Sequence, residues 1–179
     1  LIAQAPTGSG KTAAFGLGLL AQLNPRFFGC QSLVLSPTRE LAAQITEELR
    51  KLARGMGNIK IVTLSGGVPF GPQAASLEQG AHVIVGTPGR VQDHLNRGTL
   101  QLDSLNCLVL DEADRMLDMG FVDAIREIVS HTPSRRQTLL FSATYPPSLA
   151  QLTGDLLRDP AQVKVERASA DNPIEQRFY

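Results

Sequence analysis

The sequence is short of three features that would point to a class at once: long hydrophobic runs, an excess of one charge, and cysteine. No apolar stretch approaches the roughly 18–20 residues that a membrane-spanning helix needs, so we expect no membrane partner. The 17 Lys and Arg residues balance the 17 Asp and Glu residues. A nucleic acid would have to be bound by a local patch or by backbone amides, because the whole molecule has no net field to attract it.

Cysteine and histidine give no sign of a metal site. The two cysteines, Cys30 and Cys107, lie far apart in apolar segments, and no C-x-x-C pair or Cys/His spacing suited to zinc is present. Two free buried thiols are typical of a reducing compartment, which predicts a cytoplasmic protein. The three histidines, His82, His94 and His131, show no ligand spacing, so we expect core or surface residues and not catalysts.

Length and composition predict one folded domain. The 179 residues are 42% hydrophobic and 19% charged, which excludes disorder and a coiled coil. We expect residues 1–165 to form this domain and residues 166–179, which include an Ala-Ser-Ala-Asp-Asn-Pro stretch, to start an interdomain linker. The chain begins on Leu1 inside a strand-like run, so it is expected to be a piece that lacks its extreme N-terminal segment.

Short apolar runs recur along the chain, and the first six begin 22 to 31 residues apart, close to the ~30 residues of a β-α-β unit. The runs are continuous, as in strands buried on both faces. They span Leu1–Ala5, Ser32–Leu35, Lys60–Leu64, His82–Val85, Cys107–Leu110, Thr138–Phe141 and Val163–Val165. Apolar residues at helical spacing lie between them, with one stripe over Leu41–Leu52 and another over Leu117–Ile128. This alternation predicts an α/β fold with a mostly parallel central sheet and helices on both faces.

Polar clusters follow each of the first six runs directly. They are Ala5–Gly8, Pro37–Glu40, Ser65–Gly67, Thr87–Arg90, Asp111–Asp114 and Ser142–Thr144. In open parallel sheets, ligands bind outside the carboxyl ends of the strands. We therefore expect the six clusters to meet at one edge of the sheet and to form one extended functional surface.

The first cluster continues into a candidate phosphate-binding loop between a strand and a helix. The loop consists of Ala5, Pro6, Thr7, Gly8, Ser9, Gly10, Lys11 and Thr12, and it departs from the general P-loop pattern only at its first position, where that pattern has Gly. The glycines let backbone N–H groups surround phosphate oxygens at the helix N-terminus. Lys11 would reach the β- and γ-phosphates, and the Thr12 hydroxyl would bind Mg²⁺. The alternative is a glycine-rich turn that only caps a helix.

Two adjacent acids, Asp111 and Glu112, stand at the end of the apolar run Cys107–Leu110. An aspartate there can hold Mg²⁺ opposite the P-loop threonine, and the adjacent glutamate can orient and deprotonate an attacking water. The alternative is that Asp111 is a helix N-cap and Glu112 a first-turn helix acid. Together with the P-loop, the two acids indicate a Mg-nucleoside triphosphatase.

The motifs taken in order resemble those of a known family. Asp111-Glu112-Ala113-Asp114 is similar to the motif that gives DEAD-box ATP-dependent RNA helicases their name. The chain resembles the first RecA-like domain of that family in five further motifs, Ala5–Thr12, Pro37–Ala42, Gly66-Gly67, Thr87–Arg90 and Ser142–Thr144. The segment Arg115–Phe121 is also typical of the family.

The resemblance implies a role for each motif. It makes Lys11 and Thr12 ligands of the nucleotide and Mg²⁺, Asp111 a metal ligand and Glu112 the catalytic base. Residues implied to line the path of one RNA strand are Pro37, Thr38, Arg39, Gly66, Gly67, Thr87, Gly89 and Arg90. Residues implied to couple nucleotide state to RNA binding are Asp114, Ser142 and Thr144. From the residues alone, the alternative is that these segments are ordinary turns at helix starts.

The resemblance implies an RNA-dependent ATPase and RNA helicase that uses ATP and Mg²⁺ as cofactors. It also implies contacts to the sugar–phosphate backbone of RNA, with little sequence preference. A second RecA-like domain of the same chain would supply arginines for phosphoryl transfer, so the fragment alone is expected to be nearly inactive. Segments Gly16–Leu20, Pro69–Gln73 and Pro173–Tyr179 are similar to a bacterial subtype associated with large-subunit ribosomal RNA, which implies ribosomal RNA precursors as partners. Two alternatives stay open: an ATP-gated RNA clamp with little turnover, and a P-loop motor that acts on DNA.

Overall fold

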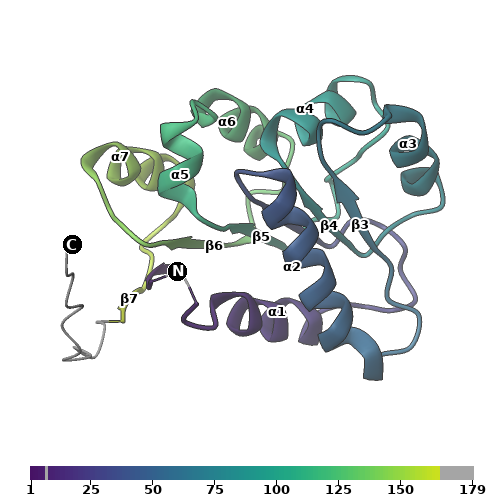
Figure 1. Ribbon diagram of the computed structural model, residues 1–179, viewed down its shortest axis with the longest axis horizontal. Coiled ribbons are helices and arrows are strands. Elements are labelled where there is room, and N and C mark those ends of the chain that lie inside the picture. Colours follow the sequence, from purple (N-terminus) through teal and green to yellow (C-terminus); the bar gives the residue numbers. More distant parts are fainter. Residues whose placement is uncertain (7, 166–179) are drawn as a thin grey trace, which may run out of the picture.

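The structure is a computed structural model that describes residues 1–6 and 8–165 (Figure 1). Strands and helices alternate along it except where α6 (Val122–Ser130) directly follows α5 (Ala113–Asp118). The strands are β1 (Ile2–Gln4), β2 (Ser32–Leu35), β3 (Ile61–Leu64), β4 (Val83–Gly86), β5 (Cys107–Leu110), β6 (Gln137–Ser142) and β7 (Gln162–Lys164). The helices are α1 (Lys11–Ala21), α2 (Arg39–Leu52), a short 3-10 turn η1 (Ala53–Gly55), α3 (Phe70–Glu78), α4 (Pro88–Asn96), α5 (Ala113–Asp118), α6 (Val122–Ser130) and α7 (Pro147–Leu156). The linker expected over residues 166–179 lies outside the described residues.

The seven strands form one sheet in the order β3-β4-β2-β5-β6-β1-β7. Each pairing within the described part of the chain is parallel. All seven predicted runs match a strand to within one residue at either end. The predicted α/β fold is therefore confirmed, and the sheet is more uniformly parallel than the sequence alone indicated.

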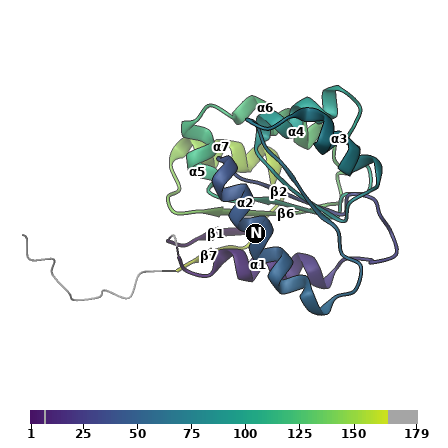
Figure 2. The same cartoon turned by 45° about the vertical axis from the view of Figure 1, so that its right-hand side comes forward.

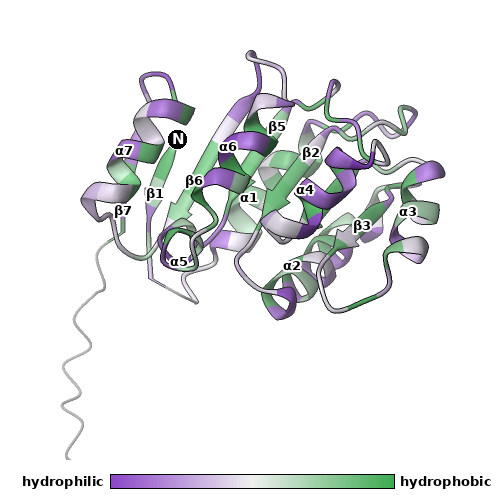
Figure 3. Cartoon of the chain, turned by 90° about the horizontal axis from the view of Figure 1, so that it is seen from above, coloured by the Kyte–Doolittle hydropathy of each residue, from purple (hydrophilic) through white to green (hydrophobic). Residues whose placement is uncertain are grey.

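Helices cover both faces of the sheet: in Figure 2, α1 lies beneath it and α3 to α7 above. Helix α2 packs on the same side as α1. Successive strand residues point to opposite faces, so that Val34 packs with α1 and α2 whereas Leu33 and Leu35 pack with the other layer. In Figure 3 the central strands are hydrophobic, and α4 and α6 show hydrophilic residues on the side turned to the viewer. This burial on both faces explains why the strands are continuous apolar runs.

The predicted stripe over Leu117–Ile128 is not one helix but the end of α5 and the start of α6. Gly120 has a φ of +78°, its N–H donates to the carbonyl of Leu117, and the next N–H, of Phe121, donates to the carbonyl of Met116. This pair of hydrogen bonds is a Schellman motif, which ends a helix at a residue in the left-handed conformation. The apolar residues on both sides still pack into one cluster, which is why their spacing suggested a single helix.

Strand β7 differs from the predicted burial of the strands on both faces, because all three of its residues are exposed. Among the described strands it pairs only with β1, at the end of the sheet. The prediction of free buried thiols is confirmed for Cys30 and Cys107. Burial raises the pKa of Cys30 to about 12 and that of Cys107 to about 11, which keeps both thiols protonated and unreactive.

The described helices include none that is both long and apolar enough to cross a membrane.

Two glycines differ in the space around them, so replacing each with alanine should change the free energy of unfolding in opposite directions. A Cβ on Gly86 would lie 2.7 Å from the carbonyl oxygen of Leu64 and 2.7 Å from a methyl carbon of Val91, so Gly86→Ala should lower the free energy of unfolding by about 1–3 kcal/mol. A Cβ on Gly154, inside α7, meets no atom within 4 Å, so Gly154→Ala should raise it by up to about 1 kcal/mol. Urea unfolding of both variants measures the difference, and equal stabilities would contradict the close packing around Gly86.

Candidate functional site

The glycine-rich loop lies between β1 and α1, as the sequence predicted. Gly8 and Gly10 have φ values of +79° and +84°, and a Cβ built on either meets no atom within 4 Å. Glycine is therefore required there by the backbone conformation and not by lack of space. Ser9 between them is exposed, whereas Thr7 lies outside the described residues.

Helix α1 presents an uncompensated positive end to this loop. Its N-cap, Gly10, gives no side-chain hydrogen bond, and its first turn carries no acidic residue. The unpaired N–H groups and the helix dipole together favour an anion at this position. Lys11 adds a full charge, and its Nζ donates to the carbonyl oxygens of Ala5 at 2.9 Å and Pro6 at 3.3 Å. A phosphate could take the place of these carbonyls with a short movement of one flexible side chain.

The two acids stand directly after β5, next to the loop. Asp111 is only 3% exposed, and its Oδ1 accepts a hydrogen bond from the N–H of Glu112 at 3.1 Å. Burial raises the pKa of Asp111 to about 6, although the positive charge of Lys11 acts in the opposite direction. A carboxylate buried in this way is stabilised by a cation placed against it.

Glu112 occupies the N-cap of α5 in a left-handed conformation, with φ 51° and ψ 51°. Such a conformation is rare for a residue with a side chain and is typical of functional sites. Its side chain gives α5 no capping hydrogen bond, and the Asp111 side chain bonds to the N–H of Glu112 itself. The N-cap of α5 is therefore Glu112 and not Asp111, and the Glu112 side chain does not cap the helix.

Glu112 also forms an ion pair that the sequence analysis missed. Its Oε2 lies 3.3 Å from Nη1 of Arg115, one turn further along α5, and its side chain is 20% exposed. The spacing of three residues on a helix was the signal that could have indicated this pair. The ion pair holds the glutamate carboxylate at the mouth of the cleft.

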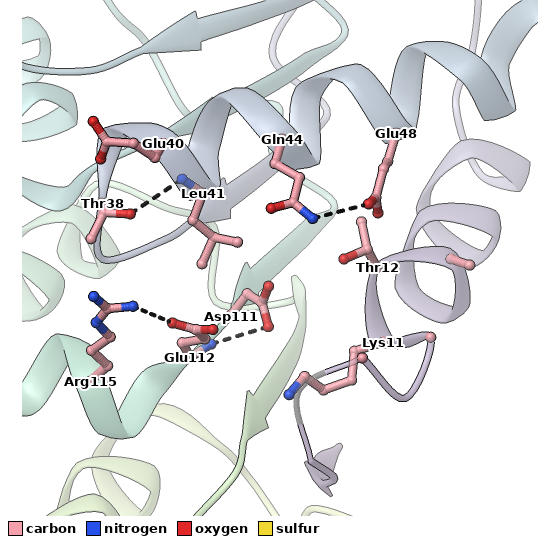
Figure 4. A pocket seen from close by; sticks show the side chains of 13 residues that line it. Lys11, Thr12, Thr38, Glu40, Leu41, Gln44, Glu48, Asp111, Glu112 and Arg115 are labelled. Atoms are coloured by element: carbon pink, nitrogen blue, oxygen red, sulfur yellow. Dashed lines mark hydrogen bonds and ion pairs between the residues drawn. The ribbon is translucent and has the colours of Figure 1, made fainter.

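These groups surround one cleft of about 650 Å³ (Figure 4). Helix α2 forms its opposite wall, with Gln44 donating to Glu48 at 3.4 Å. Predicted site residues that line the cleft are Gly8, Gly10, Lys11, Thr12, Thr38, Asp111 and Glu112, and further lining residues include Glu40, Gln44, Glu48 and Arg115. Ala5 is buried at the end of β1, and Pro6 is half-buried behind the loop. The cleft brings the predicted phosphate and acid motifs together.

The donor set in the cleft fits Mg²⁺. The Thr12 hydroxyl and the Asp111 carboxylate both line it and offer hard oxygen ligands. Mg²⁺ prefers such oxygens and commonly takes the rest of its ligands from phosphates and water. These two residues could therefore hold a magnesium ion that is bound to a nucleotide.

Three further predicted loops follow β2, β3 and β4, which are neighbours in the sheet. A Cβ built on Gly67, which has a φ of +75°, would lie 2.9 Å from Nη1 of Arg39, so the loops after β2 and β3 are in contact. Arg90, at the start of α4, donates through Nη1 to the carbonyl oxygen of Val68 at 3.1 Å, which joins the loops after β3 and β4. The three loops form one continuous surface beside the cleft.

Within this surface the predicted residues differ in exposure. Arg39, Gly66 and Gly67 are exposed, whereas Thr87, Gly89 and Arg90 are half-buried. Thr38 and Pro37 differ from these in having a local structural role. The Thr38 hydroxyl accepts from the N–H of Leu41 at 3.2 Å and caps α2, and Pro37 is buried, so it would shape the loop and not touch a ligand.

The structure also brings together Asp114, Ser142 and Thr144, the three predicted coupling residues. Asp114 Oδ2 accepts from the Thr144 hydroxyl at 2.7 Å and from the Thr144 N–H at 2.9 Å. The N–H of Asp114 donates to the Ser142 hydroxyl oxygen at 3.3 Å. Burial acts to raise the pKa of Asp114, but the hydrogen bonds from Thr144 and Ser142 outweigh it and hold this pKa below its ordinary value. The start of α5 is thus tied to the end of β6.

A P-loop, a buried aspartate and a glutamate at the carboxyl edge of an all-parallel sheet define a RecA-like nucleotide-binding domain. The family model of the DEAD/DEAH box helicases matches residues 1–152. The chain therefore belongs to the DEAD/DEAH box helicase family.

Particular relatives agree with this assignment. The chain is 58% identical over 176 residues to the ATP-dependent RNA helicase DbpA of Escherichia coli (strain K12), which covers 98% of the chain and 38% of that protein. It is 45% identical over 179 residues to the DEAD-box ATP-dependent RNA helicase CshA of Bacillus subtilis (strain 168), covering 100% of the chain and 36% of that protein. The crystal structure of a DEAD box protein from the hyperthermophile Methanococcus jannaschii matches with a TM-score of 0.88 and 42% identity, over 92% of this chain and 45% of that one. The chain thus spans less than half the length of these relatives.

The hydrogen bonds at Asp114 predict a pH-dependent effect of Thr144→Ala. Because the pKa of Asp114 is lowered in the folded state, the stability from its hydrogen bonds is present above pH ~4 and is lost as the pH falls through the folded pKa. Loss of the hydroxyl should reduce the free energy of unfolding by about 1 kcal/mol at pH 7, since the site is partly exposed, and by less at pH 3. Urea unfolding at both pH values measures this.

Thr132→Ala is the matched control, because the Thr132 hydroxyl donates to a neutral carbonyl, that of Val129. Its effect should be the same at both pH values. A Thr144→Ala effect that is equally pH-independent would contradict the role assigned to the Asp114 carboxylate.

Proposed function

We propose that this chain is the ATP- and RNA-binding core domain of an RNA-dependent ATPase and RNA helicase that locally unwinds or remodels RNA. One observation carries the proposal: the P-loop cleft and the three loops after β2, β3 and β4 open at the same edge of the sheet. A nucleotide in the cleft and a nucleic acid on the loops would lie side by side. Membership of the helicase family supports this assignment.

The chemistry of hydrolysis would be divided among the cleft residues. Lys11 and the amides at the start of α1 would bind the phosphates, and Thr12 and Asp111 would hold Mg²⁺. Mg²⁺ when bound neutralises charge on the phosphates. Glu112 would orient the attacking water and accept its proton.

RNA would bind to the loop surface through its sugar–phosphate backbone. Arg39 and Arg90 supply positive charge, and Gly66 and Gly67 leave backbone amides open to phosphate oxygens. Such contacts carry little base specificity, which suits a domain of zero net charge that binds any single strand of suitable shape. Contacts to 2′-hydroxyl groups would favour RNA over DNA.

The second RecA-like domain of the same chain is the proposed partner in the catalytic cycle. ATP and RNA would bind across the two domains and shift an open–closed equilibrium toward the closed state. Asp114, tied to Ser142 and Thr144, lies three residues from Asp111 and would pass changes in the cleft to the end of β6.

The cellular target is the finest part of the proposal. We assign ribosomal RNA precursors as the RNA target, and ribosome biogenesis as the process, on the similarity of Gly16–Leu20 and Pro69–Gln73 to the ribosomal-RNA-associated bacterial subtype. The free buried thiols of Cys30 and Cys107 support a place in the reducing cytoplasm.

Substitution of Glu112 tests the proposed chemistry in the full-length protein. Glu112→Gln keeps the size of the side chain but removes the base, so RNA-stimulated ATP turnover should fall by about 10²–10⁴-fold while ATP and RNA binding remain. Steady-state turnover with and without RNA, beside direct binding of both ligands, measures this.

Glu47→Gln is the control, because Glu47 is exposed on α2 and pairs only with Lys51 among its described neighbours. It should leave turnover unchanged. If the wild-type protein binds ATP and RNA but shows no RNA-stimulated turnover, the clamp alternative replaces the helicase.

The isolated chain should hydrolyse ATP very slowly. Arginines of the second RecA-like domain are expected to contribute about 10³–10⁵-fold to the rate, as arginine fingers do in general. Residues 1–179 alone should therefore turn over ATP at least about a thousandfold more slowly than the full-length protein, with no duplex unwinding. Strong RNA-stimulated turnover by residues 1–179 would refute this division of the active site.

A further inference from the structure

Two buried polar side chains, Gln73 on α3 and His94 on α4, connect the loop after β3 with helix α4. Gln73, on α3, is 8% exposed, and His94, on α4, is fully buried. Polar side chains are rarely buried to this extent without a structural or functional reason. The histidine spacing predicts only that His94 is a core or surface residue, and no sequence motif indicates a role for the Gln73 side chain.

The two side chains form a hydrogen-bonded chain with a defined direction. Gln73 donates through Nε2 to the carbonyl oxygen of Ser65 at 3.0 Å, so its Oε1, 3.2 Å from Nε2 of His94, must be an acceptor. His94 therefore carries its proton on Nε2. With the proton on Nε2, its Nδ1 is an acceptor for the Thr99 hydroxyl at 2.8 Å, and this hydroxyl also lies 3.1 Å from the carbonyl oxygen of His94. Burial, reinforced by the charge of Arg90, lowers the pKa of His94 to about 4, which keeps the imidazole neutral.

Three further contacts join the loop after β3 and the start of α3 to α4. The ring of Phe70 stacks on the His94 imidazole, with centroids 4.1 Å apart and an angle of 16° between the rings. The guanidinium of Arg97 lies 4.4 Å from the centre of the same Phe70 ring. Arg90 bonds to the carbonyl oxygen of Val68. The hydrogen-bonded chain through Gln73 is the buried member of these contacts, and the others are on its solvent side.

The hydrogen bonds from Ser65 through Gln73 to His94, here called the bridge, join two of the loops that face the RNA in the proposed function. Ser65 precedes Gly66-Gly67, and His94 lies on the helix that begins with Thr87–Arg90. Loops alone are the mobile part of a fold, and each could present its amides and arginine at a range of distances. A fully satisfied buried hydrogen-bond chain selects one arrangement, because any shift would leave Gln73 or His94 without a partner.

We propose that Gln73 and His94 are positioning residues for RNA binding: they fix the Gly66-Gly67 loop relative to the start of α4, so that both contact successive phosphates of one strand. The inference rests on the proposed function of the chain. Neither side chain touches RNA itself, and neither lines the nucleotide cleft. The bridge therefore affects RNA affinity and leaves ATP affinity unchanged.

The first test removes the bridge in the full-length protein. Gln73→Leu keeps the volume but removes the partner of His94 Nε2 and of the Ser65 carbonyl oxygen, and His94→Ala removes the ring. Each should weaken binding of a single-stranded oligoribonucleotide about tenfold, and raise the RNA concentration for half-maximal ATPase by a similar factor, with ATP affinity unchanged. Fluorescence anisotropy and steady-state ATPase titrations measure the three quantities.

The second test separates positioning from simple loss of stability. A glutamine amide nitrogen can reach the place of His Nε2, whereas an asparagine side chain reaches only that of Nδ1. His94→Gln should therefore keep the bond to Gln73 and bind RNA within about threefold of wild type, and His94→Asn should keep only the bond to Thr99 and resemble His94→Ala. Urea unfolding of the two variants shows whether stability follows the same order.

Matched controls come from the same helices or residue types. Gln79→Ala, at the exposed end of α3, and His131→Ala, exposed after α6, should both bind RNA as wild type does. Variants at Gln73 and His94 that equal these controls would overturn the inference alone, as would affinities that follow stability with no difference between His94→Gln and His94→Asn. Failure of the wild-type protein to bind RNA would overturn the proposed function as well.

Discussion

Parallel pairing of the strands is the constraint on which both halves of the site depend. A parallel strand must be followed by a crossover, so the end of every strand and the start of every following helix come to the same edge of the sheet. Strand β2 pairs with β4 and β5 in a register that sets Val34 beside Val85 and Val109. A shift by one residue would turn the apolar side chains of β2 to the wrong layer, so the two cores fix the height at which each loop emerges.

The same edge concentrates charge that the neutral molecule does not show as a whole. The start of α1 and the ammonium of Lys11 face the buried carboxylate of Asp111, whose raised pKa reflects the cost of holding a charge there. An Mg-nucleotide would satisfy both sides at once, with phosphates on the amides and the metal against the carboxylate. The bond network from Asp114 to Thr144 begins only three residues away, which gives the cleft a direct connection to the rest of the edge.

Polar groups are placed differently in the loop surface. There the groups that would face a ligand are backbone amides, the exposed Arg39 and the half-buried Arg90. Gln73 forms buried contacts with Ser65 and His94 beneath them. The nucleotide cleft is built on a helix start and a strand end, which are rigid by themselves. The loop after β3 also lies between a strand end and a helix start, and buried hydrogen bonds through Gln73 join it to α4 as well.

The sequence by itself determined the strands, the P-loop, the acids after β5 and the edge at which they meet, because continuous apolar runs and glycine spacing are local properties of the chain. Only the tertiary structure decided the break between α5 and α6, where apolar spacing is the same for one helix or two. It also decided the hydrogen bond between Gln73 and His94. The residues of the bridge are 21 apart in the chain, and a buried amide and imidazole become partners only when packing removes water from both.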